Sequence, residues 1–521
     1  MTRQIAEGSG VLEPLLSRVA AICPQVSDPF EATAIVESFG YTDRIIQEEF
    51  AQPDSRTLGV IIYERLRDAP GEPLPDDAPR PAPRAGESRL RESLRVLAQT
   101  CSLSLIYSLP WIAAFVLERR YPDLMQLPPD AAAPLSVALM ASLILSGGFV
   151  QCIARKGQFY NSLSQPGVGG AVCLRIWQLG LAAATIAAVA AVAIGLYFEL
   201  FQPRYLLLAT LHFEALTVLW MTCAILWLDR TYWQVPAVFV AGAAAFWGSH
   251  SAGQATLVST MASTLAALTA AVVLMALRRA ARRSRGGKSD VIVAPRYPVL
   301  FRSLTPYFCY GLGYFSFVFA DRIAAGTSVS TSAGVQFAID PGYKLGMDVS
   351  LLVFLVSMTA VEFINFDFMR FWQDEAQRWT PTAGAHYRER LRRRYRWSRL
   401  CVVGVYAGVA LLVSILVGSP DASAGVVPRH ALMLGLAGYL LFELALFNAL
   451  VLFSVNAGVA VLKSLAPALL INAGLGYVLS NAMGPLWAAG AMAAGAAVFL
   501  WQSHFKVHEA LARPGYSCYV S

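Results

Sequence analysis

Apolar residues occur in long blocks along most of the chain, and short polar segments separate them. A block of about 20 apolar residues is the length that crosses a bilayer as an α-helix. The pattern therefore predicts an all-α polytopic membrane protein with twelve transmembrane helices. The predicted spans are residues 96–116, 132–154, 177–198, 205–228, 235–251, 254–277, 303–323, 346–366, 399–418, 431–453, 458–480 and 483–503.

Two of these spans contain similar sequences toward their outer ends. Residues 107–119 and 310–322 align without a gap, and both end in an acidic residue followed by arginine. These acid–arginine pairs are Glu118 with Arg119 and Asp321 with Arg322. Because the two stretches lie in spans 1 and 7, each opens a set of six spans. We therefore expect two parallel six-helix halves, related by an axis along the membrane normal.

The sequence outside the spans predicts further segments. Residues 1–68 have the helical periodicity and capping residues of a small cytosolic helical module. The prolines that follow indicate an extended linker. The complete division is 1–68 (module), 69–95 (Pro-rich linker), 96–277 (first half), 278–302 (basic linker), 303–505 (second half, with an interfacial segment at 367–398) and 506–521 (cytosolic tail).

Composition supports a membrane protein and its charge indicates an orientation. The chain is 56% hydrophobic and 14% charged, against about 25% charged residues in soluble proteins. Its net charge of +7 comes from basic residues in alternate loops, which is typical of loops on the cytoplasmic side. We expect a multi-pass protein of the bacterial cytoplasmic (inner) membrane with both termini in the cytoplasm. Topology explains the arginines, so nucleic acid is not an expected partner.

The interfacial segment 367–398 combines an aromatic face with many arginines. Phe368, Phe371, Trp372 and Trp379 recur at helical spacing, and Tyr387, Leu391 and Tyr395 do so further on. This composition is typical of a helix lying on anionic membrane lipid. A docking surface for an acidic partner or a lipid-linked phosphate is the alternative interpretation.

Motifs of soluble enzymes are absent from the sequence. No P-loop, GxSxG, HExxH or dinucleotide-binding motif is present. The eight cysteines form no CxxC and no Cys/His cluster, so we expect neither a disulfide nor a metal site. The sequence therefore predicts neither an enzyme nor a cofactor-binding protein.

Ionisable residues within predicted spans are the candidates for function, because they are costly in lipid and usually face an interior or water. Glu214 and Glu443 fall in corresponding spans of the two halves, Asp348 opens span 8, and Glu362 lies near its inner end. The two glutamates have two interpretations: they line a path for a ligand or proton, or they form a hydrogen bond between helices. The acid–arginine pairs fit either structural ion pairs or substrate contacts. Tyr310 and Tyr314 fit either sugar stacking or aromatic packing.

Spans 7 and 8 also carry a narrower resemblance. Its residues are Pro306, Tyr307, Phe308, Tyr310, Gly311, Tyr314 and Phe315, then 319–322 and 344–348. The sequence of these segments resembles that of the Pel exopolysaccharide transporter family (PelG), within the multidrug/oligosaccharidyl-lipid/polysaccharide (MOP) flippase superfamily. The resemblance implies export of a polymer, or flipping of a lipid-linked glycan, beside a cytoplasmic glycosyltransferase and other inner-membrane subunits. It also directs attention to Tyr310, Asp321, Arg322 and Asp348.

Four functions follow as hypotheses. The first is a glycan transporter that works by alternating access between its two halves. The second is an ion-coupled small-molecule or drug antiporter of the same fold, with Glu214 and Glu443 as its proton sites. The third is a membrane-bound glycosyl- or acyltransferase, which would need a catalytic residue in a sizeable loop. The fourth is a non-transporting scaffold or sensor whose cytosolic module binds partners.

Overall fold

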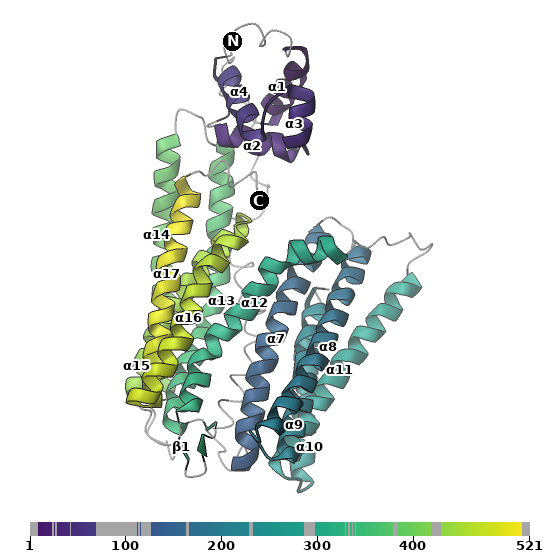
Figure 1. Cartoon of the computed structure of the whole chain (residues 1–521), viewed down its shortest axis with the longest axis vertical. Helices are drawn as coiled ribbons and strands as arrows, with labels where there is room; N and C mark the ends of the chain where they lie inside the picture. Colours follow the sequence, from purple (N-terminus) through teal and green to yellow (C-terminus); the bar gives the residue numbers. More distant parts are fainter. Residues whose placement is uncertain are drawn as a thin grey trace, which may run out of the picture.

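The computed structural model is almost entirely helical in the residues that it describes (Figure 1). These are residues 9–22, 26, 29–41, 43–68, 112, 115, 127–162, 166–228, 233–285, 297–328, 330–331, 334–335, 337–338, 340–378, 384–417 and 429–512. Of the predicted first span, only Ile112 and Phe115 are described, and both are helical. Phe115 packs against the core of the second half. Glu118 and Arg119 lie outside the described residues.

Eleven described helices coincide with predicted spans 2 to 12. In the first half they are α7 (Pro129–Ser162), α8 (Pro166–Tyr197), α9 (Pro203–Leu228), α10 (Gln234–Ser251) and α11 (Thr256–Arg285). In the second half they are α12 (Tyr297–Thr327), α13 (Pro341–Arg378), α14 (Gly384–Val417), α15 (Arg429–Ser454), α16 (Gly458–Met483) and α17 (Ala488–Ala512), with the 3-10 turn η2 (Pro485–Trp487) before α17. Among the described residues, nine of these helices are long and apolar enough to cross a membrane.

The two halves repeat one packing scheme. In the first half α7 packs on α8 and α9, α9 packs on α11, and α10 packs on α11. The equivalent pairs pack in the second half: α13 on α14 and α15, α15 on α17, and α16 on α17. The packing therefore agrees with the predicted duplication into two six-helix halves.

The halves meet where α7 and α12 approach closely (Figure 1). A Cβ atom added at Gly311 of α12 would lie 2.2 Å from the carbonyl oxygen of Gly147 on α7. One added at Gly147 would lie 2.3 Å from the ring of Phe315, and one at Gly148 would lie 2.6 Å from the ring of Phe308. Small residues allow helix backbones in a membrane to approach this closely. The glycines therefore set the spacing of the two halves.

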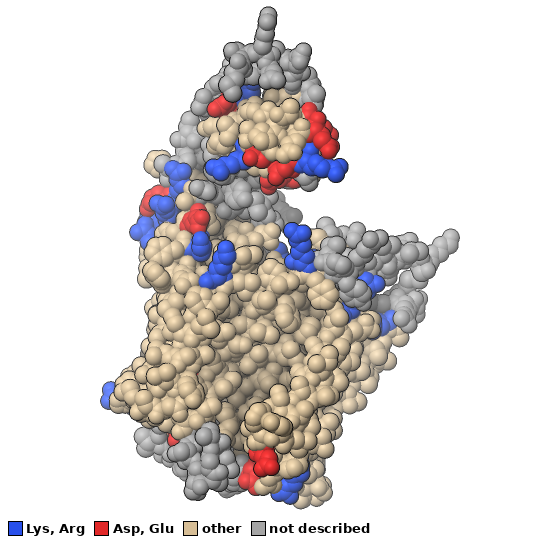
Figure 2. Space-filling model, in the orientation of Figure 1, with Lys and Arg blue, Asp and Glu red and all other residues tan. Residues whose placement is uncertain are grey.

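Several helices continue beyond their predicted spans at the end of the molecule that carries the basic residues. In α13 and α14, 12 residues (367–378) and 15 residues (384–398) extend past the predicted apolar segments. Span prediction detects only apolar residues, whereas arginine, glutamine and alanine also favour helix. Figure 2 shows lysine and arginine side chains gathered at this end, above a broad surface without charge. We call it the basic end.

The described residues of the aromatic face of segment 367–398 are buried, apart from the half-buried Phe371, and Trp379 lies outside the described residues. This corrects the interpretation of the face as lipid-contacting. Phe368, Trp372, Tyr387, Leu391 and Tyr395 are at most 5% exposed and belong to the core of the second half. The extended end of α17, including its buried residues at 507 and 511, contributes to the same core. Helical spacing identified the shared face, but the segments pair with other helices rather than lying flat on lipid.

The N-terminal module forms a bundle with a core of its own. Its helices are α1 (Ser9–Ile22), α2 (Pro29–Ser38), α3 (Asp43–Phe50) and α4 (Ser55–Asp68). Leu15, Val19, Ile35, Ile46 and Ile62 are buried against one another. Pro29 occupies the first position of α2, as its fixed φ favours, and Asp54 caps α4. The segment that the sequence predicts to be helical thus contains four helices in the described residues.

Candidate functional site: an ionic cluster between α12 and α13

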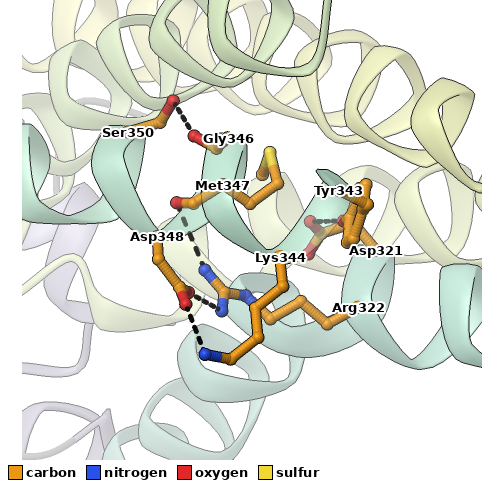
Figure 3. Close-up of polar contacts among 8 residues, drawn as sticks. All are labelled: Asp321, Arg322, Tyr343, Lys344, Gly346, Met347, Asp348 and Ser350. Atoms are coloured by element: carbon orange, nitrogen blue, oxygen red, sulfur yellow. Dashed lines mark hydrogen bonds and ion pairs between the residues drawn. The ribbon is translucent and has the colours of Figure 1, made fainter. Parts of the chain in front are cut away.

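A charged cluster lies where α12 ends and α13 begins (Figure 3). Asp321 of α12 is fully buried. The hydroxyl of Tyr343, in the first turn of α13, donates a hydrogen bond to Oδ2 of Asp321. Oδ1 of Asp321 has no hydrogen-bond partner among the described residues. A buried polar atom is normally satisfied, so this oxygen is an available acceptor.

Arg322 reaches from α12 to the same turn of α13. Its NH1 group lies 2.7 Å from Oδ1 of Asp348 and its NH2 group 3.3 Å from the carbonyl oxygen of Met347. Nζ of Lys344 lies 3.5 Å from the other carboxylate oxygen of Asp348. The side chains of Arg322 and Asp348 are only 12% and 22% exposed. Asp348 therefore holds two cations at a largely dehydrated position.

The first turn of α13 is formed by a local sequence signal. Asp340 caps the helix, since its Oδ1 accepts a hydrogen bond from the backbone amide of Tyr343 at 2.7 Å. Pro341 follows at the first helical position, where a missing N–H group costs nothing. The helix thus starts earlier than the predicted span, which began at residue 346. Residues that we expected in a loop, including Tyr343 and Lys344, are therefore helical. The side chain of Tyr343 meets Asp321 of α12, and that of Lys344 lies beside Asp348 (Figure 3).

Neighbouring helices fix the position of the α12 segment. Nδ2 of Asn472 on α16 donates to the carbonyl oxygen of Phe317 at 2.8 Å, and Oγ of Ser480 donates to that of Ala324 at 3.0 Å. Tyr439 of α15 is fully buried and lies close enough to Arg322 to interact with its charge. Between α12 and α13, the described residues form only the two-residue strands β1 (Ser330–Thr331) and β2 (Gly334–Val335), which pair antiparallel.

The cluster combines two acids and two bases. Asp321 and Asp348 supply negative charge, and Arg322 and Lys344 supply positive charge, so the four charges balance. Oδ1 of Asp321 and Nε of Arg322 are buried without a partner among the described residues. A group that offers both a donor and an acceptor can satisfy both atoms, and hydroxyl groups do so. The arrangement is suited to binding a polar, uncharged group or to exchanging ion-pair partners.

The two intramembrane glutamates lie elsewhere, each bonded to a helix of its own half. Oγ of Ser357 on α13 donates to Oε2 of Glu443 at 2.6 Å, and Glu443 is fully buried. Its Oε1 has no partner in the described part of the chain. In the first half, Oγ1 of Thr185 on α8 donates to Oε1 of Glu214 at 2.7 Å. Both glutamates thus form a hydrogen bond between helices. This was one of the two interpretations that the sequence left open.

The remaining candidate functional residues either pack against other side chains or lie on the surface. Tyr310 and Tyr314 pack edge-on or stacked against Phe453 and Phe442 of α15, with ring centroids 4.7 and 5.7 Å apart. This is the aromatic packing that was the alternative to sugar stacking. Glu362 is exposed on α13. The cluster thus unites Asp321, Arg322 and Asp348, whereas the other described candidates lie outside it.

Sequence reasoning did not select Tyr343, Tyr439 or Ser357. The Asp-Pro cap signal at 340–341 places Tyr343 in a first helical turn and was the available clue. Tyr439 precedes Glu443 by one helical turn and so shares its face, which was a weaker clue. Nothing in the sequence indicated Ser357. Among the described residues, no group of three or more His, Cys, Asp or Glu side chains is arranged to hold a metal ion.

Comparison with known proteins identifies the fold. No protein-family model matches the sequence, and no protein with a curated description matches it. Among solved structures, an outward-facing multidrug resistance MATE family transporter of the MOP superfamily is similar, with a TM-score of 0.52 and 13% identity over 81% of this chain and 96% of its own. A MOP superfamily transporter from Pyrococcus furiosus is also similar, with a TM-score of 0.52 and 11% identity over 81% of this chain and 97% of its own.

This chain has the MOP transporter fold. At such low identity the similarity concerns the fold alone. The Pyrococcus furiosus protein is described as having a binding pocket of reverse polarity that suggests a different function. Within the MOP fold of the present chain, the ionic cluster lies in the second half, between its first two helices, α12 and α13.

Proposed function

We propose that this protein is a membrane transporter that exports or flips a polysaccharide or lipid-linked glycan across the bacterial cytoplasmic membrane. Its two halves expose a polar path to each side of the membrane in turn, which is the mechanism expected of two packed repeats. The MOP fold and the close contact between α7 and α12 support transport by relative movement of the halves.

One observation favours a glycan as the substrate. The resemblance to the Pel exopolysaccharide transporter family rests on two separate segments, 306–322 and 344–348. The 2.7 Å ion pair between Arg322 and Asp348 joins these two segments in one cluster. The unpartnered donor and acceptor atoms of Arg322 and Asp321 complement the hydroxyl groups that cover a sugar chain.

Partners of the transporter follow from the same proposal. A polymer that is exported must first be synthesised, so we propose that a cytoplasmic glycosyltransferase and other inner-membrane subunits act beside this protein. The α1–α4 module has its own core and exposed acidic residues such as Glu37 and Glu48. We assign it the role of docking such a subunit.

The test measures secreted and cell-surface polysaccharide in a bacterial strain that lacks this gene. The strain is complemented with the wild type, with Arg322→Gln, or with Asp348→Asn, after the membrane level of each protein is checked. We expect loss of polymer in the deletion strain, and at least a tenfold reduction with either variant. Lys506→Gln is the matched control, because it removes an exposed ion pair to Glu509 on α17.

Two results would contradict the proposal at different levels. Unchanged polysaccharide in the deletion strain would exclude glycan export. Full rescue by both well-expressed variants would leave export standing and would reduce the cluster to a structural role.

An ion-coupled antiporter of small molecules is a second candidate, because Glu443 is a fully buried carboxyl group with one unpartnered oxygen. Such groups in transporters commonly form proton relays. The test is substrate-driven proton movement in proteoliposomes without any glycosyltransferase. Wild-type exchange that is abolished by Glu443→Gln and retained by the Glu362→Gln control would favour the antiporter. No exchange by the wild type would exclude it.

A further inference from the structure

A second polar cluster lies at the basic end of the second half, away from the α12–α13 site. Arg392, Arg396 and Arg399 lie on α14 at positions i, i+4 and i+7 and so share one face. His504 and His508 of α17, also one turn apart, face them with ring centroids 4.4 Å from each other. All three arginines are close enough to His508 to repel its charged form.

Hydrogen bonds fix one side of this cluster. NH1 of Arg399 lies 3.1 Å from Nδ1 of His504. Because arginine can only donate, Nδ1 accepts, and His504 is neutral with its proton on Nε2. The hydroxyl of Tyr395 donates to Oδ1 of Asn448 at 2.6 Å, and Nδ2 of Asn448 donates to Oγ of Ser503 at 3.0 Å. This buried network holds α14, α15 and α17 in register, and the hydroxyl oxygen of Tyr395 also lies 3.2 Å from Nδ1 of His504.

Among the described residues, the carboxylates at this end do not neutralise Arg392 or Arg399. Glu389 pairs with Arg396 of the cluster, and the others pair with bases outside it: Asp367 with Arg394, Glu375 with Arg390, and Glu509 with Lys506. Asp374 is exposed on α13 and forms no ion pair among the described residues. In the same part of the chain, Arg392 makes no hydrogen bond or ion pair, and its Nε atom is buried. The buried Nε of Arg399 is likewise without a partner.

The side chains of Arg392 and Arg399 are partly exposed, but their Nε–H donors are buried without a partner among the described residues. A buried unsatisfied donor is costly, and arginine cannot lose its proton to avoid this cost. An anion placed between α14 and α17 would relieve this cost. Phosphate suits the donors present, since guanidinium groups bind phosphate with two parallel hydrogen bonds. Nε2–H of the neutral His504 is a further donor. Basic pockets between transmembrane helices at the cytoplasmic surface are known to hold phosphate-bearing lipid headgroups.

We propose that Arg392, Arg399, His504 and His508 form a phosphate-binding site between α14 and α17 at the basic end of the second half. Its ligand is a phosphate group, carried either by an anionic phospholipid or by a soluble phosphate compound. This site is separate from the α12–α13 cluster and does not depend on the proposed transport of a glycan.

The test uses the full-length purified protein with two probes. Binding of inorganic pyrophosphate is measured by calorimetry in lipid-free detergent, and retention of phosphatidylglycerol is measured by native mass spectrometry. The test variant is Arg392→Gln, which removes no hydrogen bond between described residues. The matched control is Arg393→Gln, which removes an exposed arginine of the same helix. Unchanged thermal unfolding shows that each variant is folded, and His508→Gln replaces Arg392→Gln if that variant does not fold.

The expected result is at least a tenfold loss of binding in Arg392→Gln, with the control equal to the wild type. Loss of pyrophosphate binding identifies a soluble phosphate compound, and loss of retained phosphatidylglycerol identifies a lipid headgroup. The proposal is overturned if the wild type binds neither probe, or if Arg393→Gln weakens binding as much as Arg392→Gln. In the latter case the arginines attract anions only through their total charge.

Discussion

Among the described residues, Tyr343 is the side chain that donates a hydrogen bond to the buried carboxylate of Asp321. Its hydroxyl is the hydrogen-bond donor to Oδ2 of Asp321, and Oδ1 already lacks a partner. Replacing Tyr343 by Phe keeps the ring and removes the donor. Leaving a buried polar group unsatisfied costs about 1–3 kcal/mol, and more for a charged group. We expect Tyr343→Phe to lower the thermal unfolding midpoint of the detergent-solubilised protein by several degrees.

Tyr477 supplies the matched control for this change. Its side chain on α16 is 58% exposed, so Tyr477→Phe removes the same hydroxyl group without desolvated partners. Equal midpoints for the two variants would show that the Tyr343–Asp321 hydrogen bond contributes nothing to stability.

Asp54 is a residue whose protonation controls a helix end. Its Oδ1 accepts a hydrogen bond from the backbone amide of Thr57 at 2.7 Å, and this bond lowers the pKa of Asp54 below its ordinary value. Because the folded pKa is lower than the unfolded pKa of about 3.9, the stabilisation of α4 is complete above that pH. It is lost as pH falls through the folded value.

Hydrogen exchange of the full-length protein, corrected for intrinsic rates, measures this effect at the start of α4. We expect faster exchange at a pH below the lowered folded pKa of Asp54 than at pH 6, because the cap is then protonated. Asp54→Asn keeps a capping oxygen that does not titrate, so it should abolish the pH dependence. The same pH dependence in Asp54→Asn would show that another group is responsible.

At the scale of elements, the α7–α12 contact depends on glycine. Gly311→Ala places a methyl group 2.2 Å from the carbonyl oxygen of Gly147, so the helices must separate. Overpacking of this kind typically costs about 1–3 kcal/mol. Gly404→Ala on α14 is the matched control, because nothing lies within 4 Å of the added carbon. We expect a lower thermal unfolding midpoint for Gly311→Ala only, and equal midpoints would contradict the close contact.

The positions of the helices could be predicted from the sequence more fully than the contacts between them. Apolar block length located spans 2 to 12, since it reflects the bilayer itself. Periodicity also found the face shared by Phe368, Tyr387 and Tyr395, but it could not say whether lipid or protein covers that face. Among charged residues, the acid–arginine pair at 321–322 was singled out by its repetition. Its partner Tyr343 was not, because contacts between α12 and α13 depend on where α13 begins.

At the scale of the whole molecule, the basic end defines an orientation. Positive residues favour the cytoplasm, so we expect the C-terminus and the α1–α4 module to lie there, and the β1–β2 hairpin to lie outside. Green fluorescent protein fused after residue 521 should fluoresce, because it folds in the cytoplasm. Alkaline phosphatase inserted between β1 and β2 should be active only if that loop is exported. The opposite pattern of activities would reverse the orientation.

The long α13–α14 hairpin has a practical consequence for electron microscopy. α13 contains 38 residues, which corresponds to about 57 Å, whereas the hydrocarbon layer is about 30 Å thick. A membrane protein of this size is largely surrounded by its detergent micelle, and its two similar halves are difficult to tell apart in projection. A helical rod that protrudes from one half, on one side of the micelle, provides a built-in marker for aligning particle images.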